Sequence, residues 1–191
     1  LAVLPFFHIY GMTLLLELAV WSGAKVVTIP KFIPDLYLRL LKEHSVTMAH
    51  VAPPLINFLA KHPSVDQALP LPALRELFSG AAPLGDDLAK AAKERLNVEI
   101  VRQGYGMTEM SPASHIGPRS KPKGGSIGCL VPGMEMKLIS PVDGNPVTGT
   151  NQDGEIWLRG PNIMKGYYKN EEETKSTIDA EGFLHTGDVA V

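Results

Sequence analysis

Short apolar runs alternate with amphipathic segments along the first part of the chain. The runs that indicate buried strands cover residues 1–7, 25–29, 46–51, 74–78 and 98–101. The segments whose apolar residues recur with helical spacing cover residues 11–21, 35–43, 54–61 and 85–96. Such strand–helix alternation predicts a largely parallel sheet. Because the strands are apolar runs rather than alternating ones, we expect helices to flank the sheet on both faces, which is an α/β fold.

The pattern changes after residue 117. Residues 118–125 are rich in proline, glycine and lysine, as expected of a border between subdomains. The elements predicted beyond this border are strands at 134–139 and 155–159, and a short helix at 171–178 that Asn170 caps. We therefore expect an α/β subdomain over residues 1–117 and a small antiparallel β subdomain over residues 118–191.

The composition is that of a folded protein and narrows the choice of partners. Of the 191 residues, 45% are hydrophobic and 20% are charged, so a sizeable core is expected. The formal net charge is −2 and no basic face is evident, which argues against nucleic acid as a partner. Cys129 is the single cysteine, so no internal disulfide can form, and we expect a reducing, intracellular compartment.

The longest apolar segment and the two ends of the chain bear on its context. Residues 12–20 are interrupted by Glu17 and are too few to span a bilayer. The chain opens on Leu1 within an apolar run, without an initiator methionine or a signal peptide, and Val191 closes another apolar run. We therefore expect an internal piece of a longer protein.

Residues 104–109 carry the clearest candidate chemistry, and we expect them on a turn between a strand and a loop. The glycines that flank Tyr105 would let the backbone approach a ligand closely. The tyrosine ring offers a flat face to a purine and Thr108 offers a hydroxyl to a phosphate. Glu109 offers a carboxylate oxygen to Mg²⁺, which prefers oxygen ligands. The pattern indicates a nucleotide site, although a glycine-rich turn capped by a threonine would have the same residues.

Other segments join this one in a recognisable order. They cover residues 5–11, 79–84, 103–109, 154–161, 166–168 and 185–188. In this order and spacing, the chain resembles the adenylate-forming superfamily over essentially its whole length. That superfamily includes acyl-CoA synthetases, 4-coumarate–CoA ligases, beetle luciferases and the adenylation domains of peptide synthetases. Residues 8–10 and 106–109 are most similar to the 4-coumarate–CoA ligase and luciferase-like branch.

The resemblance implies a reaction in two steps, with ATP, Mg²⁺ and coenzyme A as the cofactors or co-substrates. A carboxylate attacks the α-phosphate of ATP and gives an acyl-adenylate and pyrophosphate, and a thiol then displaces AMP. Positioning and charge stabilisation should supply most of the catalysis, because two anions must be brought together. The sequence fits this chemistry, since it shows no convincing Ser-His or Cys-His arrangement for a protein nucleophile.

The resemblance also implies a role for each residue of the nucleotide site. Tyr105 would pack on adenine, Thr108 would contact the α-phosphate, and Glu109 would bind Mg²⁺. Asp188 would accept hydrogen bonds from both ribose hydroxyls, which suits a carboxylate because it only accepts. An ordinary turn tyrosine and a strand-end aspartate are the plain alternatives. The other implied nucleotide-binding positions are Ser79, Gly80, Ala81, Ala82, Pro83, Gln103, Gly104, Gly106 and Met107.

An acyl pocket and a coenzyme A contact are implied in the same way. His8 would lie near the reacting carboxylate in an orienting or gating role, because a carboxylate needs no general base at neutral pH. The catalytic residues implied are Thr108, Glu109 and His8. Lys31 would contact coenzyme A, with a plain surface lysine as the alternative. The implied pocket residues are His8, Tyr10, Leu14, Ala81, Gly106, Ala113 and Ile116, for which ordinary core positions are the alternative. Many relatives carry glycine where this chain has Ala81, whose methyl group would narrow the pocket floor.

The leading hypothesis is the central piece of an ATP-dependent carboxylate–CoA ligase. The family's phosphate loop would precede His8, and its mobile C-terminal domain with a catalytic lysine would follow Asp188, so we expect the isolated chain to be inactive. A luciferase-like oxygenase and a non-catalytic nucleotide-binding homologue are the alternatives. The substrate would be an aromatic or fatty carboxylic acid. Its identity, the oligomeric state and the choice between cytoplasm and peroxisome stay open.

Overall fold

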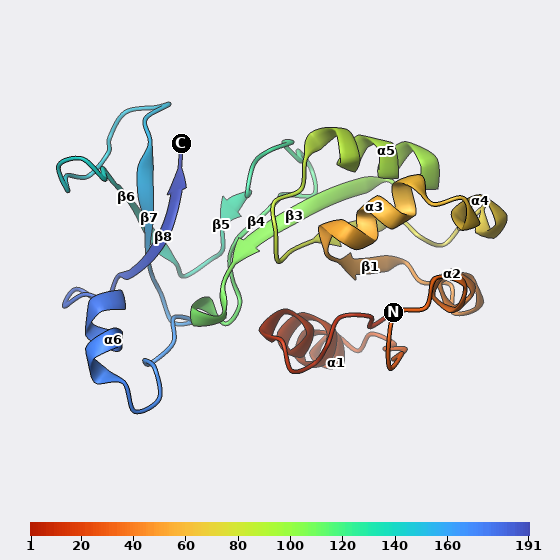
Figure 1. Cartoon of the computed structure of the whole chain (residues 1–191), viewed down its shortest axis with the longest axis horizontal. Helices are drawn as coiled ribbons and strands as arrows, with labels where there is room; N and C mark the ends of the chain where they lie inside the picture. Colours follow the sequence, from red (N-terminus) through yellow and green to blue (C-terminus); the bar gives the residue numbers. More distant parts are fainter. The chain divides into compact units, whose positions relative to one another are not determined.

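The computed structural model describes all 191 residues, which form two compact units (Figure 1). The first unit comprises Leu1–Met107 and His115–Cys129, and the second comprises Thr108–Ser114 and Leu130–Val191. This division and the change of composition at residue 118 fall at different places. The second unit therefore takes its first segment from the middle of the predicted nucleotide motif.

A parallel sheet forms the centre of the first unit. Strand β2 (Glu76–Ser79) pairs in parallel with β1 (Met48–Val51) on one side and with β3 (Ile100–Gly106) on the other. The strand order continues to β4 (Ala113–Ile116) and β5 (Cys129–Leu130), two strands that the sequence did not predict. The predicted α/β class is confirmed. All four residues of β2 are buried, including the polar Glu76 and Ser79, as expected of a strand covered on both faces.

Helices cover this sheet much as the apolar spacing predicts. Three of them confirm the prediction, namely α2 (Pro34–Glu43), α3 (Pro53–Lys61) and α5 (Asp86–Leu96), whereas the short α4 (Ser64–Ala68) was not predicted. Both α2 and α3 begin with proline. Proline lacks an N–H group, and it fits the first turn because N–H groups there have no acceptor within the helix. Helices α3 and α5 pack against each other (Figure 1).

The core of the first unit lies between these helices and the sheet. Its members are apolar side chains from α2, α3, α5 and the first strands. Those that are essentially fully buried include Tyr37, Leu41, Val51, Ile56, Leu59 and Leu77. This core holds β1 and β2 in register, and so it fixes the loops that follow the carboxyl ends of both strands.

The N-terminal region departs from the prediction. The predicted helix at 11–21 forms, but it begins as a π-helical segment (Gly11–Glu17) before α1 (Leu18–Trp21). The predicted strands at 1–7 and 25–29 are wrong, because only a single parallel bridge joins Ala2 to Thr28. Pro5 and Pro30 follow the two bridged residues closely. Proline has no N–H group to donate to a neighbouring strand, so the pairing stops there.

The second unit contains a three-stranded antiparallel sheet with the order β6-β7-β8. Strands β6 (Glu135–Ile139) and β7 (Gly154–Arg159) confirm two predicted strands, and α6 (Glu171–Thr177) confirms the predicted helix. The Asn170 side chain accepts a hydrogen bond from the Glu173 amide, as a capping residue should. Strand β8 (Leu184–Ala190) includes residues 185–188, one of the segments that carry the family resemblance. None of the helices in the structure combines the length and the apolar character needed to cross a membrane.

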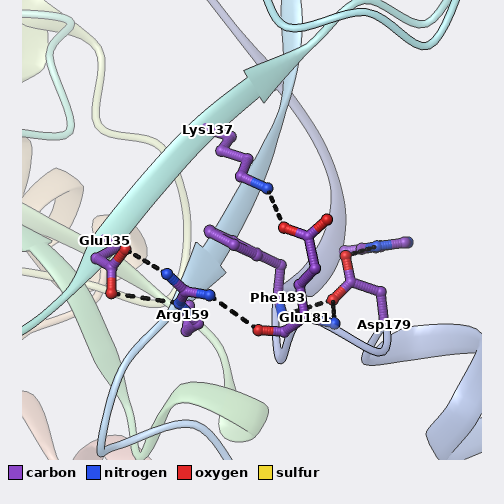
Figure 2. A network of polar contacts seen from close by, with 7 residues as sticks. Glu135, Lys137, Arg159, Asp179, Glu181 and Phe183 are labelled. Atoms are coloured by element: carbon purple, nitrogen blue, oxygen red, sulfur yellow. Dashed lines mark hydrogen bonds and ion pairs between the residues drawn. The ribbon is translucent and has the colours of Figure 1, made fainter.

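One face of this antiparallel sheet carries a network of charged groups around an aromatic ring (Figure 2). The Phe183 ring lies between the Lys137 Nζ, 3.9 Å from its centroid, and the Arg159 guanidinium, 4.4 Å away. Arg159 also pairs with Glu135 at 2.6 Å, and Lys137 pairs with Glu181 at 2.7 Å. The network joins β6 and β7 to the turn that leads into β8.

Candidate functional site

The predicted nucleotide motif is divided between the two units. Residues 103–106 belong to β3, so the strand continues through the glycines where a turn was expected. Thr108 and Glu109 belong instead to a short 3₁₀ helix (Thr108–Met110) of the second unit. The expected turn is therefore limited to the residues around Met107, and each half of the motif is held by its own unit.

In the first unit, close packing explains the first glycine of the motif. A Cβ atom on Gly104 would lie 2.9 Å from Cζ of Phe78 and 3.1 Å from the His115 carbonyl oxygen. Tyr105 is partly buried, with its ring centroid 5.9 Å from that of His115. Burial lowers the pKa of His115, so this imidazole is neutral at physiological pH.

The Gln103 side chain holds the loop that follows β2. Its Oε1 atom accepts a hydrogen bond from the Leu84 amide at 3.1 Å, and its Nε2 atom donates to the Ser126 carbonyl at 3.1 Å. Both ends of this amide are therefore engaged in positioning the chain. A contact between Gln103 and an acyl-adenylate stays a prediction.

The loop at 79–84 leaves β2 in a defined conformation. Ser79 is fully buried, and the Gly80 amide donates to the Val51 carbonyl at 3.2 Å. Ala81, Ala82 and Pro83 are exposed. Ala81 has a φ of +73°, a left-handed conformation that costs a residue with a Cβ atom about 1 kcal/mol. A glycine there would be unstrained. The residue at position 81 therefore affects backbone strain as well as the width of the predicted pocket.

Tyr10 packs directly under this loop. Its hydroxyl donates to the Phe78 carbonyl at 3.0 Å, and a Cβ atom on Gly80 would lie only 2.8 Å from its ring. The tyrosine is 6% exposed, and burial raises its pKa, so it is a neutral donor. The structure thus brings one predicted acyl-pocket residue, Tyr10, against a predicted nucleotide-binding residue, Gly80.

His50 is a neighbour of Tyr10 that the sequence gave no reason to select. Its ring centroid lies 6.0 Å from that of Tyr10 and 5.4 Å from that of Phe78. The Nδ1 atom is buried without a hydrogen-bond partner. Burial is the main cause that lowers the pKa of His50 to about 4, and the charges of the amino terminus and of Arg102 add to it. A neutral imidazole therefore belongs to this aromatic cluster.

The remaining residues predicted in the first unit are more dispersed. His8 is exposed, and its Nδ1 atom accepts the Tyr10 amide at 3.1 Å. Leu14 lines a hollow of about 460 Å³ that His50 also lines. Lys31 is exposed in the loop ahead of α2, and Ile116 is partly buried on β4. His8 contacts the Tyr10 region through its bond to the backbone.

In the second unit, the Glu109 carboxylate accepts a hydrogen bond from a tyrosine that is distant in the sequence. The Tyr167 hydroxyl donates to Oε1 of Glu109 at 2.8 Å. The Met164 amide donates to the Glu109 carbonyl at 2.8 Å. The hydrogen bond to Glu109 is the largest cause that raises the pKa of Tyr167, and burial adds to it. The tyrosine is therefore protonated and acts as the donor.

An asparagine secures the same segment. The Asn162 Nδ2 atom donates to the Met110 carbonyl at 2.6 Å and to the Ala113 carbonyl at 2.9 Å. The residue predicted to line an acyl pocket, Ala113, is thus fixed through its main chain. Tyr167 lies in a segment that the sequence singled out, but its partner is 58 residues away, so no local pattern could reveal the contact.

The donor set is compatible with magnesium only in combination with a nucleotide. No group of three or more His, Cys, Asp or Glu side chains in the structure could hold a metal ion. Mg²⁺ commonly binds one or two carboxylates together with phosphate oxygens and waters. Glu109 offers such a carboxylate, with Oε1 held by Tyr167. The fit is therefore to a metal–nucleotide complex.

Asp188 lies at an irregularity between β7 and β8. The register shifts between Glu155 and Trp157, and Gly187 has a φ of +72°. The Thr186 hydroxyl donates to the Ile156 carbonyl at 2.7 Å and accepts the Asp188 amide at 3.1 Å. This threonine fixes the backbone of Asp188, whose side chain is largely exposed.

Further contacts support this bulge from both sides. Oε1 of Glu155 accepts the Gly187 amide at 3.0 Å. Ahead of β8, Oδ1 of Asp179 accepts the Phe183 amide at 2.9 Å (Figure 2). The Oδ2 atom of Asp179 lies 3.3 Å from Nε2 of His185. Desolvation pushes the pKa of Asp179 upward, but these bonds outweigh it and lower the pKa overall. The sequence singled out residues 185–188, but not the residues whose hydrogen bonds hold them.

Known proteins similar to this chain were found in sequence and in structure. The sequence model of the AMP-binding enzyme family matches residues 1–168. A probable 4-coumarate–CoA ligase 1 of Dictyostelium discoideum is 46% identical over 190 residues, which cover 99% of this chain and 34% of the relative. The chain thus spans about a third of the length of the curated relatives it matches.

Two solved structures extend this likeness to the fold. ATP-bound MatB from Rhodopseudomonas palustris superposes with a TM-score of 0.86 at 27% identity, over 98% of this chain and 36% of that one. A red-emitting luciferase from Phrixothrix hirtus gives a TM-score of 0.79 at 33% identity, over 99% of this chain and 42% of that one. On the extent of the sequence match and of the shared fold, this chain belongs to the AMP-binding enzyme family.

Proposed function

We propose that this chain is the central part of an ATP-dependent carboxylate–CoA ligase. In the first step, a carboxylate oxygen bonds to the α-phosphorus of ATP while the bond to pyrophosphate breaks. In the second, the sulfur of coenzyme A attacks the acyl carbonyl carbon, its proton passes to solvent, and AMP leaves. The 46% identity to a probable 4-coumarate–CoA ligase supports this reaction class. The substrate is then an aromatic or fatty carboxylic acid.

The residues that the family resemblance singles out would each have a role in the first step. In the first unit, Tyr105 packs on adenine, and the backbone of the loop at 79–84 borders the base. In the second unit, Thr108 contacts the α-phosphate, Glu109 holds Mg²⁺, and Asp188 accepts the ribose hydroxyls. When bound, the metal neutralises phosphate charge, and the protein's part is to hold these groups in place.

His8 and Lys31 have weaker support as functional residues. His8 is exposed and engaged with the Tyr10 amide, which fits an orienting role better than proton transfer. Lys31 is exposed and would approach coenzyme A. The acyl chain would lie near Tyr10, Leu14 and Ile116.

The observation that carries the proposal is the held carboxylate of Glu109. It combines a motif position, a fixed Oε1 atom and a family match that spans the segment. Carboxylate-dependent exchange of labelled pyrophosphate into ATP by the full-length protein tests it. We expect exchange with aromatic or fatty acids and a loss of at least about a hundredfold for Glu109→Ala. Undiminished exchange in that variant would contradict the role of Glu109.

A second candidate is a luciferase-like oxygenase, which the likeness to the Phrixothrix hirtus luciferase favours. Both enzymes would share adenylation and differ in the fate of the acyl-adenylate. Assays of the full-length protein with coenzyme A and a panel of acids, beside light emission with luciferin, separate the two. The 191-residue chain alone is expected to show no turnover, because the matched relatives are about three times as long. A non-catalytic homologue would show nucleotide binding without exchange.

A further inference from the structure

We propose that Tyr167 and Asn162 are positioning residues that orient the carboxylate of Glu109 toward a metal ion. This inference rests on the metal-binding role in the proposed function. It goes beyond that role because neither residue belongs to the 103–109 motif. Both lie in the loop after β7, and both reach back to the 108–114 segment of the same unit.

Tyr167 fixes which oxygen of the carboxylate faces a cation. A carboxylate only accepts hydrogen bonds, and its terminal torsion is soft, so an isolated glutamate presents either oxygen. The Tyr167 hydroxyl donates to Oε1 at 2.8 Å. That bond restricts rotation of the carboxylate and would leave Oε2 available to a cation. Groups that orient metal ligands in this way commonly change metal affinity by about ten- to a hundredfold.

The backbone of Tyr167 is itself held by hydrogen bonds, so its side chain can hold the Glu109 carboxylate in one orientation. The Tyr167 amide donates to Oγ1 of Thr174 at 2.9 Å, and that hydroxyl donates to the Asn170 carbonyl at 2.8 Å. A Cβ atom on Gly166 would lie 2.7 Å from the Thr174 methyl group, and Gly166 has a φ of +143°. The tyrosine is thereby tied to the first turn of α6, and a larger residue at 166 would push it away.

Asn162 fixes the main chain that carries the glutamate. Its amide nitrogen bridges the carbonyls of Met110 and Ala113, at 2.6 and 2.9 Å. The Met164 amide adds a bond to the carbonyl of Glu109 itself, at 2.8 Å. The loop thus holds both the backbone and the side chain of Glu109, and loss of either contact leaves the carboxylate less well oriented.

The neighbouring tyrosine provides a matched control. Tyr168 is 88% exposed and lies beside Lys169, whose Nζ is 5.2 Å from the ring centroid. Removing its hydroxyl changes the same chemistry one residue away without touching Glu109. Tyr168→Phe is therefore expected to leave metal binding unchanged.

The test measures metal binding directly in the full-length protein. Mn²⁺ replaces Mg²⁺ as the probe, and its free concentration is followed by electron paramagnetic resonance in the presence of a non-hydrolysable ATP analogue. For Tyr167→Phe, we expect the Kd for Mn²⁺ to rise about tenfold. The Mg²⁺ concentration for half-maximal pyrophosphate exchange should rise similarly, while the KM for the carboxylic acid stays constant. A merely structural role would change all these quantities together or none of them.

Two more variants make every outcome decisive. Asn162→Ala keeps the tyrosine, and it should weaken Mn²⁺ binding several-fold, so it decides the question if Tyr167→Phe does not fold. In Glu109→Gln, the protein should no longer lower the free Mn²⁺ concentration. If Glu109→Gln leaves Mn²⁺ affinity unchanged, the metal role in the proposed function is wrong. If Glu109→Gln weakens binding but Tyr167→Phe and Asn162→Ala do not, the positioning role alone is overturned.

Discussion

The two halves of the predicted nucleotide motif are held by different forces. In the first unit, residues 103–106 continue a strand of the parallel sheet, and Gly104 is required because the Phe78 ring and a carbonyl leave no space. In the second unit, Glu109 sits in a short 3₁₀ helix without strand pairing, and polar side chains from a distant loop hold it. Packing therefore sets the first half, and hydrogen bonds set the second.

The difference shows how each half should respond to change. A packed strand depends on volume, so an added methyl group costs stability throughout the unit. A segment held by side-chain hydrogen bonds depends on particular donors, so loss of one donor shifts one functional group with little effect on the fold. Substitutions can remove one kind of support at a time, beginning with the largest expected effect.

His50 challenges the description of the first unit as held by packing, because it is a buried polar group among aromatic rings. Its pKa is about 4 in the folded chain against 6.5 for an ordinary histidine. Between these values the unfolded state binds the proton more readily, so the free energy of unfolding falls as pH drops from about 6.5 to about 4. The full pKa difference corresponds to about 3 kcal/mol.

Urea denaturation of the full-length protein at pH 7 and pH 4.5 measures this loss. In His50→Leu, the pH dependence should become flatter, because the titrating group is gone. The exposed His62 gives a control, since His62→Gln should keep the wild-type dependence. An unchanged slope in His50→Leu would show that His50 does not carry the effect.

Gly104→Ala tests packing in the first half of the motif. The new methyl group would lie 2.9 Å from Cζ of Phe78 and 3.1 Å from a main-chain oxygen, so the strand or the ring must move. We expect the free energy of unfolding to fall by about 1–3 kcal/mol. Gly144→Asn is the control, because Gly144 has open space around it and asparagine tolerates its φ of +72°. Equal stability of the two variants would mean that packing does not require this glycine.

Thr186→Val tests the polar support of the second unit. The change keeps the shape of the side chain but removes the hydroxyl that bonds the Ile156 carbonyl and the Asp188 amide. A hydrogen bond of this kind contributes about 1 kcal/mol, so we expect AMP to bind about fivefold more weakly, with the urea midpoint little changed. Calorimetric titration of the full-length protein measures it, with Ser176→Ala on α6 as the control hydroxyl. Wild-type affinity in Thr186→Val would show that the bulge does not need this hydroxyl.

Ala81→Gly has the smallest expected effect and the opposite sign. Alanine at a φ of +73° is strained, and glycine relieves that strain while making the unfolded chain more flexible. The two effects nearly offset, so we expect a gain of at most about 1 kcal/mol. Ala82→Gly, the neighbouring change, should be neutral or destabilising. A loss of stability in Ala81→Gly larger than in Ala82→Gly would argue against the left-handed conformation.

The sequence predicts those parts of the molecule whose cause is local or periodic. Helices α2, α3 and α5 follow from apolar spacing, and the cap of α6 follows from Asn170. The strands at 1–7 and 25–29 fail, because an apolar run pairs only where a partner strand and its donors are available. Composition also gave no sign that Thr108–Ser114 would join the second unit.

The same distinction between local and long-range causes applies to the candidate site. The motif residues could be named from their order, but the groups that orient them could not. Tyr167 and Glu109 are 58 residues apart, and Thr186 acts through a register shift that only the paired strands reveal. His50 looked like part of an ordinary strand, and its buried, unpartnered ring nitrogen appears only once Tyr10 and Phe78 pack around it.

The central claim of the proposed function is that Tyr105 and Asp188 each contribute to nucleotide binding. Calorimetric titration of AMP into the full-length protein tests it most directly. Tyr105→Leu and Asp188→Asn should each weaken binding by about tenfold or more, as loss of base stacking or of a charged hydrogen bond does, while the exposed Tyr168→Leu should not. Wild-type affinity for AMP in either Tyr105→Leu or Asp188→Asn would contradict the nucleotide-binding role of the substituted residue.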